Sequence, residues 1–436
     1  MKEINKNIKS PVRAWHVLKW FSYKRHQPPH FGFSLVLPPE HRKSSRSNLP
    51  FAAIMASFSE SDRQQVLVER KSHARVLTLN RPKQLNALSF YMVSRLLEVF
   101  TEDEENSDIK LVVVKGNGRS FCAGGDVAAV AREGSKGDWK SGAKFFHTEY
   151  TMNYLMATYS KPQVSILNGI VMGGGAGASV HGRFRVVTEN TVFAMPETAL
   201  GLFPDVGAPY FLSRLPGFFG EYVGLTGARL NGAEMLVCGL ATHFVPSSKL
   251  SLLEEALCKV QTSDPNAVSA IIDKYSEQPF LKDDSVYHRM DVINKCFSRK
   301  SVEGIISSLE IEATGKADHW ISETVQTLKK ASPTSLKIFL RLIREIRLLG
   351  IGPCLVLEYR IVCHILKGHY SKDFFEGCRA ILLDKDKNPK WEPSKLELLS
   401  DSDVDRYFSK LDDEEWEELE LPKRFKNLPT YAIAKL

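Results

Sequence analysis

Short apolar runs alternate with amphipathic stretches from residue 66 to about residue 250. The short runs are rich in β-branched residues, and three of the six are followed directly by glycine or asparagine, which is typical of strands. Residues 89–101 instead repeat apolar positions every three or four residues, and Ser89 stands where it can cap a helix. The predicted strands are residues 66–69, 75–79, 111–115, 163–167, 183–188 and 191–195, with the first two and the last two each expected to pair. This alternation predicts an α/β layer architecture.

The pattern changes after about residue 251, where the chain becomes predominantly helical. Apolar residues recur there at three-to-four spacing, which indicates amphipathic helices. The predicted helices are residues 253–260, 302–312, 319–330, 335–348 and 355–369. We therefore predict an α/β core at residues 60–255 and a helical C-terminal region at residues 256–430. The pattern leaves open whether the two pack as one body.

Composition narrows the class of protein. Hydrophobic residues make up 43% of the 436-residue chain and charged residues 25%, which excludes a collagenous, low-complexity or wholly disordered chain. No run approaches the roughly 18 consecutive apolar residues of a membrane helix. The seven cysteines form no CxxC pair, and HExxH is absent. A reducing compartment is therefore favoured, and no metal site is predicted.

The net charge is concentrated at one end of the chain. Lysine and arginine outnumber aspartate and glutamate by 58 to 51, or +7, and residues 1–54 alone hold ten basic and two acidic residues. The rest of the chain, with 48 basic and 49 acidic residues, has a net charge of −1 and offers no electrostatic surface for nucleic acid. We interpret residues 1–54 as a basic, poorly ordered leader. Three readings stay open: a transit peptide, sequence upstream of a functional start at Met55, or an interaction tail.

Three loops place glycine or a carboxylate directly after a predicted strand, where ligands usually meet α/β sheets. They are residues 120–126 (SFCAGGD), 168–177 (NGIVMGGGAG) and 195–205 (MPETALGLFPD). Gly125 and Gly174 each come just before a predicted helix, so their backbone N–H groups can point at one carbonyl oxygen as an oxyanion hole. The alternative is that these glycines only allow tight turns and close packing.

The third loop carries two acids, Glu197 and Asp205, among mainly apolar neighbours. Burial beside Leu200, Leu202 and Phe203 would raise a carboxyl pKa toward the range that is useful for proton transfer at neutral pH. The alternative is an exposed loop in which Glu197 caps a helix.

Together these segments resemble the crotonase, or enoyl-CoA hydratase/isomerase, superfamily over residues 66–250. The resemblance begins at residues 79–89 (LNRPKQLNALS) and includes both glycine turns and the PETALG segment. It implies a spiral of repeated ββα units, with the N–H groups of Gly125 and Gly174 forming an oxyanion hole around the carbonyl of an acyl-CoA thioester. It also implies that CoA is held by Asn86, Ala87, Leu88, Ala123 and Asp126.

The acids decide which branch of the superfamily the chain resembles. Enoyl-CoA hydratases carry one glutamate where this chain has Gly177, and a second in the Pro-Glu segment, where this chain has Glu197. Eight residues later, Asp205 replaces the hydratase glycine. The chain therefore resembles the plant-like, peroxisomal form of the 3-hydroxyisobutyryl-CoA hydrolase branch, and agreement continues through FHTEY at residues 146–150 to NPKW at 388–391. In that branch the positions that contact substrate are Glu149, Gly174, Glu197 and Asp205.

The resemblance also implies a chemistry for these acids. Glu197 would activate water as a general base or attack the thioester to give a mixed anhydride. Asp205 would bind the 3-hydroxyl group or assist proton transfer, and Glu149 would position the substrate. The implied activity is thioester hydrolysis in valine breakdown, with no cofactor besides the CoA of the substrate. An enoyl-CoA hydratase or isomerase and a non-catalytic acyl-CoA-binding protein remain the alternatives.

The last three residues, Ala434, Lys435 and Leu436, resemble the small-basic-Leu signal that the peroxisomal import receptor reads. We therefore expect a peroxisomal protein, with the mitochondrion as the alternative through the basic leader. Crotonase relatives are often trimers or pairs of trimers, which implies a homo-oligomer. Neither a nucleic acid nor a membrane is expected as a partner.

Overall fold

The computed structural model describes residues 51–314, 318–414 and 416–424. All described residues belong to one compact unit, so the α/β core and the helical C-terminal region share that unit. The expected leader lies outside the described residues except for its last four, and the C-terminal signal at 434–436 lies wholly outside them.

The larger sheet has six strands in the order β1-β2-β3-β5-β7-β10. β1 runs antiparallel to β2, as the predicted pair requires, and the remaining strands run parallel to one another. The strands are β1 (Val66–Lys71), β2 (Ala74–Leu79), β3 (Leu111–Gly116), β5 (Gln163–Leu167), β7 (Phe184–Val187) and β10 (His243–Phe244).

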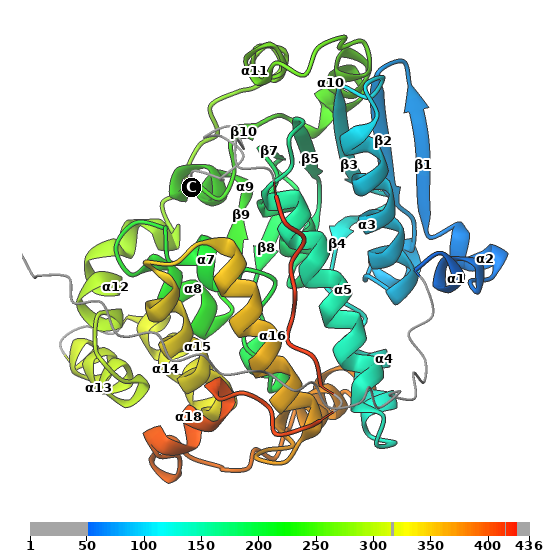
Figure 1. The fold of residues 1–436 in the computed structure, drawn as a ribbon. Coiled ribbons are helices and arrows are strands. Elements are labelled where there is room, and N and C mark those ends of the chain that lie inside the picture. Colours follow the sequence, from blue (N-terminus) through cyan, green and yellow to red (C-terminus); the bar gives the residue numbers. More distant parts are fainter. Residues whose placement is uncertain (1–50, 315–317, 415, 425–436) are drawn as a thin grey trace, which may run out of the picture. The chain divides into compact units, whose positions relative to one another are not determined.

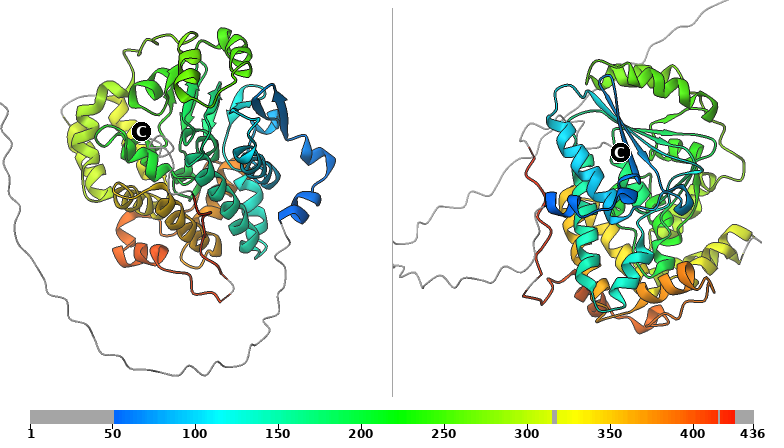
Figure 2. Two further views of the ribbon diagram at one scale, coloured as in Figure 1. Left: turned by 45° about the horizontal axis from the view of Figure 1, so that its top comes forward. Right: turned by 90° about the vertical axis from the view of Figure 1, so that its right-hand side faces the viewer.

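Helices cover both faces of this sheet, which explains its apolar sequence. Val112 and Val114 of β3 belong to one hydrophobic core, whereas Leu111 and Val113 belong to another, because successive side chains of a strand point to opposite faces. Figures 1 and 2 show one group of helices on each side of the sheet. The covering helices are α3 (Phe90–Glu105) and α5 (Trp139–Ala157) on the first face, and α10 (Leu250–Cys258) and α11 (Pro265–Asp273) on the second.

A smaller sheet determines where the candidate loops lie. Its four strands are β4 (Ser120–Cys122), β6 (Ile170–Met172), β8 (Val192–Ala194) and β9 (Leu230–Asn231). The chain passes from the larger to the smaller sheet three times, from β3 to β4, from β5 to β6 and from β7 to β8, which confirms the expected spiral of ββα units. Because β4 pairs in parallel with β6, and β6 with β8, the segments that follow these strands leave the sheet at one edge.

The C-terminal helices gather at the end of the unit away from α10 and α11 (Figure 1). Among them, α16 packs directly on α5. These helices are α12 (Met290–Phe297), α13 (Val302–Ala313), α14 (His319–Lys330), α15 (Pro333–Ile346), α16 (Ile351–Lys367), α17 (Asp373–Cys378) and α18 (Asp401–Phe408). The other helices are α1 (Phe51–Ala56), α2 (Glu60–Arg63), α4 (Val127–Gly134), α6 (Gly174–Val180), α7 (Ala208–Leu212), α8 (Phe219–Thr226) and α9 (Gly232–Cys238).

The structure confirms the predicted helices with ends shifted by a few residues, and corrects one strand pairing. Ser89 caps α3 as expected, since its hydroxyl accepts a hydrogen bond from the Met92 N–H at 3.2 Å. The predicted pairing of residues 183–188 with 191–195 is wrong, because β7 lies in the larger sheet and β8 in the smaller. The tight turn between them carries the chain from one sheet to the other. Helix α5 was not predicted.

Candidate functional site

The parallel pairing of β4 with β6 brings the two glycine turns together. A Cβ atom placed on Gly174 would lie 2.9 Å from the backbone nitrogen of Gly125, and one on Gly124 would lie 3.8 Å from the nitrogen of Gly174. The first turn is held from behind by Leu88, whose N–H donates to the Gly124 carbonyl at 2.8 Å. The two predicted backbone donors are therefore neighbours.

The N–H groups of Gly125 and Gly174 have no acceptor among the described residues. Gly174 is the first residue of α6, so its N–H lies beyond the reach of the intrahelical bonding pattern. Two adjacent N–H groups without an acceptor are the arrangement that an oxyanion hole requires.

Glu149 reaches these turns from α5. Its Oε1 atom lies 2.5 Å from the position that a Cβ on Gly174 would take. That oxygen is buried and has no hydrogen-bond partner among the described residues. Only a glycine at position 174 leaves room for this carboxyl group beside the turn.

Glu197 lies beside the second of these turns. It begins a short 3-10 helix, η2 (Glu197–Leu200), that follows β8. Its Oε1 atom lies 2.6 Å from the position of a Cβ on Gly173, and its Oε2 atom has no partner among the described residues. Since the side chain is buried, the alternative of an exposed loop with a helix-capping glutamate is wrong.

Asp205 completes the group of acids. Tyr150 follows Glu149 on α5, and its hydroxyl donates a hydrogen bond of 2.7 Å to Asp205 Oδ2. Helix α5 therefore carries Glu149 and, through the hydroxyl group of Tyr150, holds Asp205 in place.

A fourth buried acid, Glu358 on α16, interacts with the charge of Asp205. Its Oε2 accepts the Gly207 N–H at 2.9 Å, and its Oε1 accepts the Cys354 thiol at 3.0 Å. Glu149, Glu197, Asp205 and Glu358 are exposed by only 1%, 5%, 3% and 0%. Among the described residues, no lysine or arginine forms an ion pair with any of these four acids.

Burial governs the ionisation of this carboxyl cluster. It raises the pKa of Glu149, Glu197 and Glu358 well above the usual range, and the charge of Asp205 raises them further. Burial also raises the pKa of Asp205 to about 7, against the lowering effect of the Tyr150 hydrogen bond. Such carboxyl groups are suited to proton transfer near neutral pH.

We expect the protein to lose stability as the pH rises from about 4 to 7. Between the ordinary Asp205 pKa of 3.8 and its folded value of about 7, the folded chain keeps a proton that the unfolded chain has lost. The free energy of unfolding therefore falls with rising pH, by at most roughly 1.4 kcal/mol per pH unit for one group. Thermal unfolding of Asp205→Asn should show a shallower dependence, and a slope equal to that of the wild type would contradict the assignment.

The residues predicted to hold CoA lie in and beside the first glycine turn. Asn86 is buried, and its side chain is fully used, accepting from the Arg81 N–H and donating to the carbonyls of Asn117 and Ser120. Asp126 caps α4 and pairs with Arg81 at 3.1 Å. Ala87 and Leu88 follow Asn86, and Ala123 begins the glycine turn beside them, where its N–H donates to the Leu85 carbonyl at 3.0 Å.

A pocket of about 350 Å³ lies beside the second glycine turn and the segment that carries Glu197. Met172, which precedes Gly173, and Pro196, which precedes Glu197, both line it. The side chains of Arg229, Lys330 and Lys387 also line it, and they form no ion pair among the described residues. The pocket thus combines apolar walls with uncompensated positive charge.

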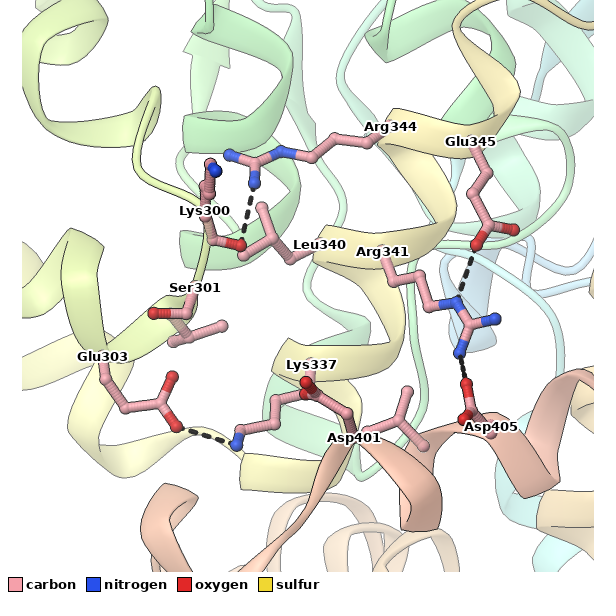
Figure 3. A pocket seen from close by; sticks show the side chains of 12 residues that line it. Lys300, Ser301, Glu303, Lys337, Leu340, Arg341, Arg344, Glu345, Asp401 and Asp405 are labelled. Carbon is pink, nitrogen blue, oxygen red and sulfur yellow. Dashed lines mark hydrogen bonds and ion pairs between the residues drawn. The ribbon is translucent and has the colours of Figure 1, made fainter.

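A second pocket, of about 440 Å³, lies between α13, α15 and α18 (Figure 3). Its lining carries four basic and four acidic side chains. Lys337 pairs with Glu303 at 2.7 Å, and Arg341 pairs with Glu345 and Asp405 (Figure 3). Because these charges compensate one another and none belongs to the carboxyl cluster, this pocket is not the candidate site.

The described residues contain no group of histidine, cysteine, aspartate and glutamate side chains arranged to hold a metal ion. No helix in the described part of the chain has the length and apolar character needed to cross a membrane.

Sequence reasoning found Glu149, Glu197, Asp205 and both glycine donors, and the structure brings all five together. It assigned no role to Tyr150, which stands in the FHTEY segment at residues 146–150, or to Glu358, which lies inside a long helix without any motif around it. Their proximity to Asp205 follows only from the packing of α5 and α16, which no local pattern reports.

The chain is similar to several known proteins. A match to the family described as enoyl-CoA hydratase/isomerase spans residues 74–408. The chain is 68% identical over 372 residues to 3-hydroxyisobutyryl-CoA hydrolase 1 of Arabidopsis thaliana, covering 85% of this chain and 98% of that protein. It is 44% identical over 375 residues to small ribosomal subunit protein mS47 of the same organism, covering 84% of this chain and 91% of that protein.

A solved structure is also similar. The structure of a carnitinyl-CoA dehydratase from Mycobacterium thermoresistibile superposes with a TM-score of 0.75 at 35% identity, covering 83% of this chain and 100% of that one. Relatives at 68%, 44% and 35% identity thus carry different names, and the side chains of the site must discriminate among their functions.

Proposed function

The chain belongs to the enoyl-CoA hydratase/isomerase family, and we propose that it is a thioester hydrolase that converts 3-hydroxyisobutyryl-CoA to the free hydroxy acid and CoA. Related esters such as 3-hydroxypropionyl-CoA are candidate substrates as well. The high identity to a relative named 3-hydroxyisobutyryl-CoA hydrolase 1, over nearly the whole of that relative, supports the proposal.

The observation that carries the proposal is the crowding around Gly177. A Cβ atom at this position would lie 2.6 Å from Val206 Cβ and 3.0 Å from Asn153 Nδ2. The second acid of a hydratase therefore has no room here, and syn addition of water across a double bond would lack one of its two groups. The acids that remain at the turns are Glu149, Glu197 and Asp205, which suits hydrolysis.

The geometry supports separate roles for the backbone N–H groups and for Glu197. The N–H groups of Gly125 and Gly174 would bind the thioester oxygen and stabilise the negative charge that develops on it. Glu197, beside Gly173, would either take a proton from the attacking water or attack the thioester carbon itself, giving a mixed anhydride that water then opens. Because CoA thiolate is a good leaving group, neither route needs strong general-acid assistance.

Asp205 would recognise the 3-hydroxyl group. Tyr150, which follows Glu149 on α5, fixes its orientation through a 2.7 Å hydrogen bond. A fixed, buried acceptor discriminates strongly against an analogue that lacks the hydroxyl group, because the acceptor is then left unpaired.

The test is a thiol-release assay with matched esters. We expect 3-hydroxyisobutyryl-CoA to be hydrolysed at least about tenfold faster, in kcat/KM, than isobutyryl-CoA, which lacks only the hydroxyl group. Loss of absorbance from an enoyl-CoA without thiol release would favour a hydratase instead. Binding of the esters without turnover would favour a non-catalytic acyl-CoA-binding protein.

The pocket lined by Arg229, Lys330 and Lys387 suits the phosphate-bearing part of CoA, because these cations form no ion pair among the described residues.

We further propose that the reaction belongs to valine breakdown. We also propose that the protein is imported into the peroxisome by a receptor that binds its C-terminal residues 434–436. Import into mitochondria through the basic leader is the alternative, and a homo-oligomer is the proposed assembly.

A further inference from the structure

The segment that carries Asp205 has an unusual backbone. Val206, the next residue, has a φ of +55°, in the left-handed region, and Gly207 follows with a φ of +80°. A β-branched residue rarely adopts this conformation, because its side chain crowds the backbone. Such strain persists only where the surroundings hold the chain in place, and it concentrates at functional sites.

Two buried side chains hold the strained peptide from its two ends. The carbonyl oxygen of Val206 accepts a hydrogen bond from His181 Nε2 at 2.7 Å, and the Gly207 N–H donates to Glu358 Oε2 at 2.9 Å. These two groups belong to one peptide bond, that between Val206 and Gly207. Together the bonds fix the rotation of this peptide plane.

The state of His181 suits this role. A carbonyl oxygen can only accept a hydrogen bond, so Nε2 carries the ring proton. Burial lowers the pKa of His181 to about 4, which keeps the ring neutral and its donor in place over the physiological pH range. The ring also lies against the peptide, since a Cβ on Gly207 would come within 2.6 Å of His181 Cε1.

The two clamping side chains come from separate parts of the site. His181 directly follows α6, the helix that begins with Gly174, whereas Glu358 lies on α16, which packs on α5. The Val206 side chain in turn packs against α6 at Gly177. The position of the Asp205 backbone is therefore tied to both the oxyanion turn and the helix that carries Glu149 and Tyr150.

We propose that His181 and Glu358 are positioning residues that clamp the Val206–Gly207 peptide and thereby aim the Asp205 carboxyl group at the hydroxyl group of the substrate. This inference rests on the proposed function for its substrate, but the clamp itself is a property of the free protein. Neither side chain needs to touch the substrate. Loss of either bond would let the peptide rotate and would disorder Asp205.

The clamp can be tested with pairs of variants of similar volume. His181→Phe and Glu358→Met remove the donor or the acceptor, whereas His181→Gln and Glu358→Gln keep one. Asp205→Asn supplies the reference for loss of the carboxylate. The first measurement is hydrogen exchange of the segment that contains Gly207, in the full chain without substrate. We expect at least tenfold faster exchange in His181→Phe and Glu358→Met, and near wild-type protection in the two Gln variants.

The second measurement is the ratio of kcat/KM for 3-hydroxyisobutyryl-CoA to that for isobutyryl-CoA. We expect this ratio to fall at least tenfold, toward that of Asp205→Asn, in both variants that break the clamp. Unchanged exchange in a folded His181→Phe or Glu358→Met protein would overturn the clamp. Faster exchange with an unchanged ratio would overturn its role in aiming Asp205. If the wild type hydrolyses neither ester, the proposed function fails, and the exchange experiment still decides the clamp.

Discussion

Glu197→Gln is expected to reduce thioester hydrolysis roughly 100- to 10,000-fold, the range typical for loss of a general base. Glutamine keeps the size of the side chain beside Gly173 but cannot take a proton from water or form an anhydride. Burial already disfavours the charged form of the Glu197 carboxyl group. A neutral amide of the same size should therefore preserve the fold and the binding of CoA esters. Single-turnover thiol release and a direct binding titration separate these two effects.

Glu234→Gln is the matched control for this variant. Glu234 is buried to the same 5% exposure as Glu197, but both its oxygens are used, one by the Asn231 N–H at the start of α9 and one by the Ser285 hydroxyl. The control should change thermal stability and leave turnover near that of the wild type. Hydrolysis by Glu197→Gln within a few-fold of the wild-type rate would refute the assigned role.

The residues of the site differ in how well the sequence alone could predict them. The two glycine turns and Glu197 closely follow strands, and Asp205 lies in the same segment as Glu197, so the composition of these segments is local evidence of their use. Glu149 was found through the family resemblance, since nothing in the unpredicted helix α5 sets it apart. Glu358 had no signal of either kind, because an acid inside an amphipathic helix is ordinarily exposed, and only the packing of α16 on α5 buries it.

The fold shows the same division between local and non-local information. Helix ends such as the cap at Ser89 depend on neighbours in the sequence and were predicted well. The sheet to which a strand belongs depends on partners that are distant in the sequence. The close spacing of β7 and β8 in the sequence therefore predicted that they pair, whereas the chain passes from the larger to the smaller sheet between them. That change of sheets is also what brings the segment after β8, with Glu197, beside the glycine turn after β6.

Gly174→Ala is expected to lower kcat roughly 100- to 1,000-fold, the range seen when one oxyanion-hole donor is lost. The conformation at residue 174 is helical, so alanine imposes no backbone strain there. The added methyl group would instead lie 2.5 Å from Glu149 Oε1 and 2.9 Å from the Gly125 nitrogen. It must displace the carboxyl group or separate the two N–H donors, and in either case the thioester oxygen loses its paired contact.

Gly350→Ala is the control for this substitution, because a Cβ at Gly350 would meet nothing within 4 Å and its φ of −82° suits alanine. It should leave both kcat and thermal stability close to those of the wild type. In Gly174→Ala the loss should fall on kcat more than on KM, since the oxyanion forms only as the thioester is attacked. A folded Gly174→Ala protein with kcat within threefold of the wild type would show that the thioester oxygen is bound elsewhere, and the paired turns would then serve only to pack β4 against β6.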